Sequence, residues 1–453
     1  MKENNNFLGT EPIGKLLFKL AVPTVAAQMI NMLYNIVDRI YIGHIPGEGD
    51  LALTGVGICM PLILIVGAFS ALAGSGGAPR ASIFMGKGDC EGAEKIMAGC
   101  FTLLVFTSAV LTAVLLMWNR EFLLAFGGSE NTIEYAVSYM NIYALGTVFV
   151  QITLGMNAYI TAQGFSKQGM KTVLIGAVCN IILDPIFIFV FDMGVKGAAL
   201  ATIISQAVSC IWVMAFLCSK KSLLKIKKEN LRIDMKVVGP CLALGLSPFI
   251  MQSSESIISI CFNSSLLKYG GDVAVGAMTI LTSVMQFAMM PLQGLGQGAQ
   301  PITSYNFGAG NKNRVKETFF LLFKVCMCYS VLLWAAIMLL PDTFAGIFTS
   351  EPALRTFAAG ALRVYCAVMF VFGIQISCQM TFMAIGYAKS SILVAVMRKF
   401  VLLIPLIYIM PAIIENKTMA VYMAEPVADF IAVTFTALLF KKQFKKALDG
   451  MGD

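Results

Sequence analysis

The sequence predicts an all-α integral membrane protein with twelve transmembrane helices, arranged as two six-helix lobes related by pseudo-two-fold symmetry along the membrane normal. Three observations support this: an apolar composition, a series of long apolar stretches, and a weak internal repeat. Of the 453 residues, 58% are hydrophobic and 13% are charged, and the mean hydropathy is +0.80. A soluble protein carries about 25% charged residues and has too little interior to bury so many apolar side chains. The composition therefore indicates a protein of the lipid bilayer.

Apolar stretches long enough to cross a bilayer follow one another along the chain, since a membrane helix needs about 20 apolar residues. Uninterrupted runs exclude a transmembrane barrel, whose strands alternate over about 10 residues. The first stretch has no short apolar core followed by a small-residue cleavage site, so we expect a retained helix and not a signal peptide. The twelve predicted spans are 16–43, 51–79, 96–118, 135–160, 172–191, 197–218, 237–267, 273–303, 318–340, 356–384, 391–414 and 418–440.

Basic residues predict the orientation of these spans. With the N-terminus inside, all but seven of the 33 Lys and Arg residues fall in or near cytoplasmic segments, Lys2, Arg398 and Lys399 among them. This excess predicts that both termini are cytoplasmic. The net charge of +8 is then a sign of topology, and we expect no nucleic-acid partner. The seven outer residues are Arg39, Arg120, Lys196, Lys268, Arg355, Arg363 and Lys417.

The longest polar stretch divides the chain near its middle. It predicts an N-terminal lobe over 1–218, a basic cytoplasmic linker over 219–236, and a C-terminal lobe over 237–453 that ends in a short basic tail. A weak repeat relates the halves, because residues 74–89 resemble residues 296–311, with a glycine pair, a proline and a final Gly-x-Gly in register. Both halves begin on the same side, so the repeat is parallel. Such a duplication places a cavity between two lobes that can rock, which is typical of transporters.

Few ionisable residues lie inside the spans, where a charge costs at least ~2.5 kcal/mol at the bilayer centre. Asp38 lies in the outer half of the first span, while Asn180 and Asp184, four residues apart, share one face of the fifth. Thr202 reaches a similar depth in the sixth span. We expect these four side chains to form one cluster of oxygen ligands, suited to H⁺ or to a hard cation such as Na⁺. Taken alone, Asn180 and Thr202 are also typical of hydrogen bonds between helices. The corresponding positions in the second half are Asn263, Phe400, Ile404 and Tyr422.

Other polar residues and one proline stand out in the spans. Glu255 in the seventh span is a secondary acidic candidate, with pairing to a nearby basic or polar side chain as its structural alternative. Glu425 and Asp429 form a third acidic face without an assigned role. Pro23 removes a backbone hydrogen bond and predicts a bend in the first span, either static or mobile. Candidates for a substrate cavity are Asn31, Tyr34, Asn35, Asn157 and Gln252.

Several of these motifs together resemble a known family. They are Pro23, the run Tyr34–Gly43, the paired Pro-x6-Gly-x-Gly motifs after the second and eighth spans, and Asn180-x3-Asp184-Pro185. The chain resembles, over nearly its whole length, the multidrug and toxic compound extrusion (MATE) family, and in particular its bacterial branch related to a staphylococcal multidrug exporter.

The resemblance implies a monomeric, multi-pass antiporter of the bacterial plasma membrane. It would expel bulky amphipathic cationic drugs by alternating access, in exchange for H⁺ or Na⁺, and without a cofactor. It implies a coupling-ion site at Asp38, Asn180, Asp184 and Thr202, a bend of the first helix at Pro23, and a further carboxylate at Glu255. The aspartate that partners this last carboxylate in some members has no counterpart, because the tenth span carries no acidic residue.

Two alternatives compete with an exporter. The single histidine, His44, argues against an enzyme built on imidazole bases or ligands, so we expect no catalytic activity. A lipid or lipid-linked oligosaccharide flippase of the same superfamily predicts a cavity rich in Arg and Lys, whereas Arg39 is the only base near the spans of the first lobe. A channel or membrane enzyme predicts a repeated selectivity loop or a catalytic group, neither of which is recognisable.

Overall fold

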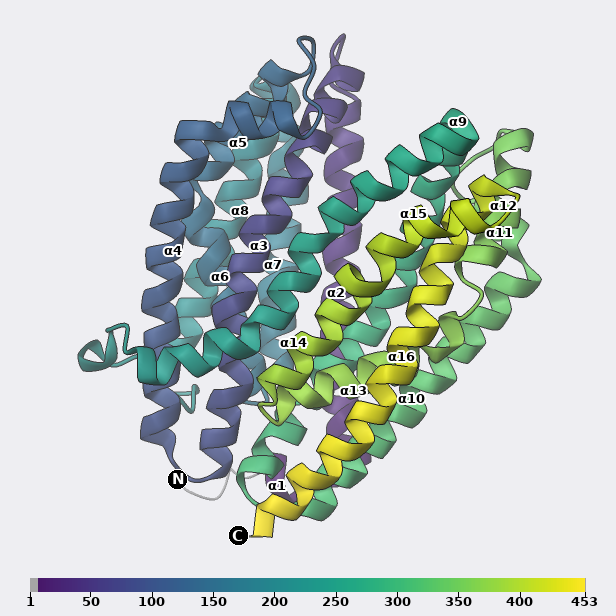
Figure 1. Ribbon diagram of the computed structural model, residues 1–453. Coiled ribbons are helices and arrows are strands. Elements are labelled where there is room, and N and C mark those ends of the chain that lie inside the picture. Colours follow the sequence, from purple (N-terminus) through teal and green to yellow (C-terminus); the bar gives the residue numbers. More distant parts are fainter. Residues whose placement is uncertain (1–6, 453) are drawn as a thin grey trace.

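The computed structural model describes residues 7–452, so that residues 1–6, with the predicted cytoplasmic Lys2, and residue 453 lie outside it. Within that range the regular structure is helical, with no β-strand (Figure 1). The long helices of the first half are α2 (Ile13–Gly43), α3 (Gly49–Gly86), α4 (Cys90–Ala125), α5 (Ile133–Leu145), α6 (Thr147–Ala162), α7 (Ser166–Pro185) and α8 (Gly194–Cys218), preceded by the short α1 (Phe7–Thr10). The second half has α9 (Met235–Gly308), α10 (Lys312–Leu339), α11 (Pro341–Gly346), α12 (Pro352–Tyr365), α13 (Phe372–Ala384), α14 (Ala388–Val396), α15 (Ile404–Ile413) and α16 (Lys417–Asp449).

These helices account for the twelve predicted spans. In the described part of the chain, nine helices are long and apolar enough to cross a membrane, and two bent pairs, α5 with α6 and α12 with 369–384, add two more. The 74-residue α9 is about 110 Å long at 1.5 Å per residue, far more than one bilayer crossing. Gly271 interrupts it with φ 65° and ψ −163°, a conformation that suits glycine. α9 thus contains two spans, and the predicted fold class is confirmed.

Local sequence signals begin and reshape several helices. The side chains of Asp89, Asp234 and Asn416 accept hydrogen bonds from the first turns of α4, α9 and α16, as N-capping residues do. Two spans contain a π-helical turn, at Ile186–Val190 after α7 and at Met397–Leu403 between α14 and α15. Pro185 directly precedes the first turn, and Pro405 follows the second turn by two residues. A proline lacks the N–H that continues the α-helical hydrogen-bond pattern, which favours such a change of pattern nearby.

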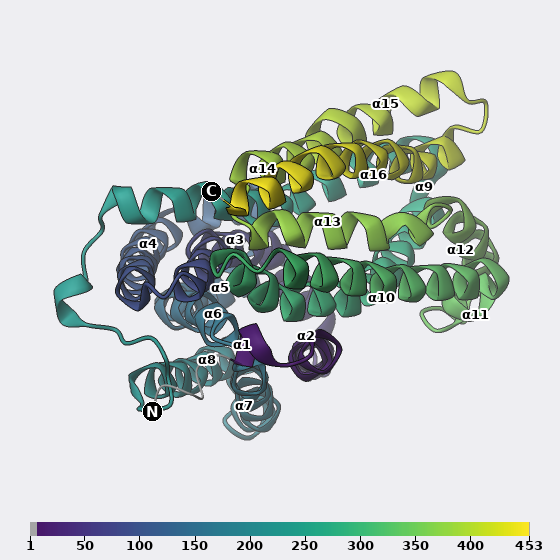
Figure 2. The ribbon, with the colours of Figure 1, turned by 90° about the horizontal axis from the view of Figure 1, so that it is seen from below.

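The helices form two bundles that meet at the end carrying α1 and the last turns of α16 and diverge toward the end carrying α5 and α12 (Figure 1). The view from below shows α3 to α8 on one side and α10 to α16 on the other (Figure 2). We call these the N-bundle, α2–α8, and the C-bundle, α9–α16. Buried side chains such as Met97 and Tyr159 build the N-bundle core, and Phe262 and Leu281 build the C-bundle core.

Helix α2 packs against both bundles. Leu16 and Leu20 in its first half belong to the same apolar core as Phe262 and Leu281, while α2 also packs along α7. Pro23 lies between these regions and is buried. The helix continues through Pro23 without a non-helical residue. Its position makes α2 a direct mechanical link between the two bundles.

The repeated glycine motifs lie where α3 crosses α9. A Cβ on Gly86 would lie 2.0 Å from the Tyr305 carbonyl oxygen, and a Cβ on Gly308 would lie 2.0 Å from the Ile83 carbonyl oxygen. These two contacts relate equivalent positions of the repeat, so the pseudo-two-fold axis passes through this crossing. The absence of a side chain lets the two backbones touch.

The polar segment between the halves is attached to the N-bundle. The Glu94 carboxylate accepts a hydrogen bond from the Lys225 backbone N–H (3.0 Å) and pairs with Lys227 Nζ at 2.6 Å. This pairing raises the pKa of the Lys227 ammonium. Gln163 Oε1 accepts from the N–H groups of Leu223 and Leu224. These contacts hold part of the linker predicted at 219–236 against the N-bundle. The predicted lobe boundaries themselves stay predictions.

Candidate functional site

The candidate site is a pair of carboxyl groups from two helices of the N-bundle. Asp38 lies late in α2 and Asp184 lies near the end of α7, and their carboxyl groups are close enough for a side-chain hydrogen bond. Asp184 is fully buried, and Asp38 is partly buried. The structure thus brings two of the predicted acidic residues together across the α2–α7 contact.

Asn180 joins this pair from one turn earlier in α7. Its amide Nδ2 donates to Asp184 Oδ1 at 3.2 Å, and its side chain is 2% exposed. Among the described residues, Asp38 Oδ1, Asp184 Oδ2 and Asn180 Oδ1 are buried and accept no hydrogen bond from the protein. Three oxygens without a donor form an arrangement that can take a proton or a small cation.

Thr202 contacts a tyrosine that lies near the acidic pair. Its hydroxyl donates to the Ala198 carbonyl oxygen at 3.0 Å within α8 and also interacts with the Tyr139 hydroxyl. Tyr139 in turn lies close enough to Asp38 for the two side chains to interact electrostatically. Thr202 therefore lies beside the cluster, with Tyr139 between it and Asp38.

Tyr34 is predicted to line the substrate cavity, but it lies beside the acidic pair. Its ring lies near both acids, Asp38 and Asp184, one turn before Asp38 on α2. Tyr143 on α5 lies close to Tyr34 and stacks on Tyr139 with ring centroids 6.2 Å apart. The sequence analysis did not select Tyr139 and Tyr143. Their four-residue spacing in an apolar helix is the only signal that could have identified them.

A separate cavity of about 230 Å³ lies between the N-bundle and α9. Asn31 and Asn157, two predicted substrate residues, line it, and Asn157 Oδ1 is buried without a donor. Gln28 Nε2 donates to Gln297 Oε1 at 3.1 Å and connects α2 to α9 beside this cavity. The polar lining is uncharged and consists of Thr24, Gln28, Asn31, Ser75, Ser82, Asn157, Thr161, Ser166, Gln297, Gln300 and Ser304.

The other two predicted substrate residues do not line this cavity. The Asn35 amide is exposed and donates to the Asn31 carbonyl oxygen at 2.7 Å. Gln252 on α9 faces α3, where a Cβ on Gly67 would lie 3.6 Å from its Oε1. The predicted substrate set is thus dispersed over four environments, and its assignment stays a prediction.

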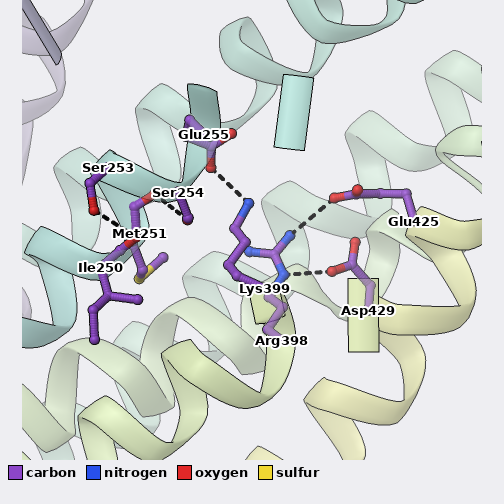
Figure 3. Close-up of polar contacts among 9 residues, drawn as sticks. All are labelled: Ile250, Met251, Ser253, Ser254, Glu255, Arg398, Lys399, Glu425 and Asp429. Atoms are coloured by element: carbon purple, nitrogen blue, oxygen red, sulfur yellow. Dashed lines mark hydrogen bonds and ion pairs between the residues drawn. The ribbon is translucent and has the colours of Figure 1, made fainter. Parts of the chain in front are cut away.

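Glu255, the secondary acidic candidate, lies in the C-bundle and is paired with a base. Lys399 Nζ lies 2.7 Å from Glu255 Oε1 (Figure 3). The neighbouring Arg398 donates from Nε to Asp429 Oδ1 at 2.6 Å, and its Nη2 lies 3.6 Å from Glu425 Oε1. The third acidic face of the sequence is thereby explained as the binding partner of Arg398.

The structure buries two bases for which the sequence predicts a position near the cytoplasmic face. Arg398 and Lys399 are 8% and 5% exposed and lie inside the C-bundle in the π-helical turn Met397–Leu403. Two adjacent bases in an apolar segment are typical of a membrane boundary. Only the acids on α9 and α16, distant in sequence, make their burial favourable.

Comparisons with known proteins give a consistent result. The family model described as MatE matches residues 23–186 and 248–409. The chain is 23% identical over 409 residues to the multidrug export protein MepA of Staphylococcus aureus (strain NCTC 8325 / PS 47), covering 89% of this chain and 88% of the relative. It is 23% identical over 443 residues to MepA of Staphylococcus haemolyticus (strain JCSC1435), covering 96% and 95%. A solved structure of MATE in the bent conformation has a TM-score of 0.93 at 21% identity, covering all of both chains.

Proposed function

Because the chain belongs to the MatE family, we propose that it is a cation-coupled antiporter that exports bulky amphipathic cations by alternating access. At the coarser level, it is a multi-pass membrane transporter and not an enzyme. The staphylococcal relatives, named as multidrug export proteins, support drugs as the exported class and a bacterial plasma membrane as the location. The observation that carries the coupling proposal is the pair of facing carboxyl groups, Asp38 and Asp184.

The pair provides the chemistry of coupling. Two carboxylates this close repel each other when both are ionised, so the pair gains by sharing one proton or by binding one cation between its oxygens. Asp38 Oδ1, Asp184 Oδ2 and Asn180 Oδ1 have no protein donor and can face such an ion. H⁺ or Na⁺ is therefore the proposed coupling ion, and Thr202 is proposed to support the site through Tyr139.

Helix α2 is proposed to convert ion binding into movement. Its outer half carries Asp38 against α7, and its inner half is packed into the C-bundle core through Leu16 and Leu20. Neutralising the pair changes how the outer half of α2 is held, and Pro23, between the two halves, is the point at which the helix can bend. To switch the protein cleanly, the ion must bind one conformation more tightly by about 5.5 kcal/mol.

The uncharged cavity is proposed to take part in substrate passage. Its volume of about 230 Å³ is below the roughly 300–1,000 Å³ of typical drug-sized sites, so a bulky substrate needs a more open conformation. Asn31 and Asn157 offer hydrogen bonds, and Asp38 supplies negative charge one to two turns further along α2. In this proposal both termini face the cytoplasm and the protein acts as a monomer.

The C-bundle does not favour the flippase alternative. A lipid-linked pyrophosphate requires unpaired bases in the cavity, but Arg398 and Lys399 are both bound by carboxylates. A phosphate ligand would have to displace these acids.

Transport by reconstituted protein tests the coupling proposal. We expect ethidium efflux from proteoliposomes to respond to an imposed pH gradient or Na⁺ gradient, and Asp38→Asn or Asp184→Asn to abolish that response, since either change removes one negative charge from the pair. Asp272→Asn, at an exposed site next to Gly271, is the matched control and should transport normally. Undiminished ion-driven efflux by both site variants would refute the coupling role. A response of the unaltered protein to neither gradient would refute ion coupling as a whole.

A further inference from the structure

The C-bundle contains a charge cluster, buried except at Glu255, that the proposed mechanism does not use. Its members are three carboxylates and two bases, so its formal charge is −1 when all are ionised. Arg398 is held between Asp429 and Glu425, and Lys399 is bound to Glu255 (Figure 3). The Arg398 guanidinium also lies 5.5 Å from the centre of the Phe372 ring. We call Glu255, Arg398, Lys399, Glu425 and Asp429 the C-bundle charge cluster.

A π-helical turn lets two adjacent residues of this cluster serve different helices. Arg398 reaches α16, whereas Lys399 reaches the first span of α9, and both belong to the turn Met397–Leu403. In the internal repeat this turn corresponds to the part of α7 that carries Asn180, with Ile404 standing at the position of Asp184. The equivalent segments of the two halves thus carry different polar groups, the Asn180 amide in the N-bundle and two bases in the C-bundle.

The two bundles also differ in what neutralises their acids. In the N-bundle, one oxygen of each acid, Asp38 Oδ1 and Asp184 Oδ2, has no donor within the described protein. In the C-bundle, Glu255 has the Lys399 ammonium at 2.7 Å, a distance typical of a charge-assisted hydrogen bond. The Glu255 side chain is 53% exposed, whereas that of Lys399 is 7% exposed. Protein atoms therefore enclose the ammonium of this pair but only part of its carboxylate.

We propose that Lys399 is a built-in counter-cation: its ammonium occupies the cation position beside Glu255 and closes the C-bundle to external cations. Among the described residues, this leaves the Asp38–Asp184 pair as the one proposed ion site. The inference rests on the proposed function only in assigning the coupling ion to that pair. The residue that determines the number of ion sites is thus Lys399.

Binding of ²²Na⁺ to the purified full-length protein tests this role. The parent is Asp38→Asn/Asp184→Asn, which removes both charges of the N-bundle pair. We expect the parent to bind no Na⁺, and addition of Lys399→Met to create one Na⁺ site per chain. Lys399→Arg, which keeps a tethered cation, should bind none. Lys399→Met combined with Glu255→Gln should again bind none, because the carboxylate is gone.

The melting temperature is a second readout, because loss of the Lys399–Glu255 pair can itself lower the stability of Lys399→Met. Its melting temperature should be higher in NaCl than in N-methylglucamine chloride of equal ionic strength, whereas that of the parent should not differ. Lys399→Gln, which keeps a hydrogen bond to Glu255, should behave in the same way. Absence of Na⁺ binding and of Na⁺-specific stabilisation in both variants would overturn the proposal, as would Na⁺ binding to the parent that Glu255→Gln abolishes. Neither result depends on transport, so this proposal can fail while the coupling role of Asp38 and Asp184 stands.

Discussion

At the scale of single residues, the two bundles treat buried charge in opposite ways. Asp38 and Asp184 face each other and form no ion pair with a base in the described part of the chain, whereas Arg398 lies between two carboxylates and is almost wholly buried. Removing one member of a buried ionic group leaves its partners uncompensated in a medium that solvates charge poorly. The charge of Arg398 is therefore a structural requirement of the C-bundle, and the charges of the acidic pair are available for function.

Arg398→Met should strongly destabilise the protein. We expect its free energy of unfolding in detergent to fall by about 3–5 kcal/mol, because Glu425 and Asp429 lose their shared partner. The triple change Arg398→Met/Glu425→Gln/Asp429→Asn should recover most of that loss. Arg355→Met breaks an exposed pair with Asp342 and serves as control, with an expected effect of at most about 1 kcal/mol. Equal destabilisation by the two single changes would contradict this interpretation.

At the scale of helices, the contact between α3 and α9 depends on glycine. Gly86 and Gly308 mark one crossing, and a second lies nearer the start of α9, where a Cβ on Gly245 would be 2.1 Å from the Leu72 carbonyl oxygen. A backbone atom cannot rotate away as a side chain can, so a methyl group at Gly245 must move one helix relative to the other. This explains why the repeat retains its glycines although its acidic residues differ.

Gly245→Ala should weaken the α3–α9 contact. Alanine favours a helix over glycine by about 1 kcal/mol, so any loss must come from the crossing. We expect a lower melting temperature for Gly245→Ala, whereas Gly276→Ala on the same helix should be neutral or stabilising. At Gly276 a Cβ meets only the Leu354 side chain, at 3.5 Å. Equal melting temperatures for the two variants would show that the crossing tolerates a methyl group.

At the scale of the whole molecule, the bundles are joined near one end and diverge at the other (Figure 1). Thr24 Oγ1 donates to the Gly294 carbonyl oxygen at 2.7 Å, and Gln28 bonds to Gln297. Alternating access requires contacts of this kind to break when the opposite end closes. The proposed cycle therefore predicts that holding α2 and α9 together here stops transport.

Cross-linking Gln28→Cys to Gln297→Cys with a short bifunctional methanethiosulfonate should stop efflux by reconstituted protein, and reduction should restore it. The same reagent applied to each single variant is the control for modification of the native cysteines, of which Cys90, Cys218 and Cys328 are exposed. Full transport by the cross-linked double variant would show that this contact persists through the cycle.

The class of the protein could be predicted from the sequence, and the residues of the candidate N-bundle site could be selected from it. Apolar stretches specify spans because a bilayer demands about 20 apolar residues, and even the long α9 was divided correctly, since Gly271 falls between two predicted spans. Asp38, Asn180 and Asp184 could be selected because charge and amide groups are rare in such helices. Their spacing on α7 places two of them on one face without further information.

Only the tertiary structure decided how the remaining charges are neutralised. Arg398 and Lys399 resemble boundary residues in the sequence, and Glu255 resembles a second ion site. Their pairing depends on α9, α16 and a π-helical turn coming together across more than a hundred residues. A local pattern reports the cost of burying a charge but not the partner that offsets it. That partner is a property of packing, and here it distinguishes an acidic pair that forms no ion pair among the described residues from acids that are bound to Arg398 and Lys399.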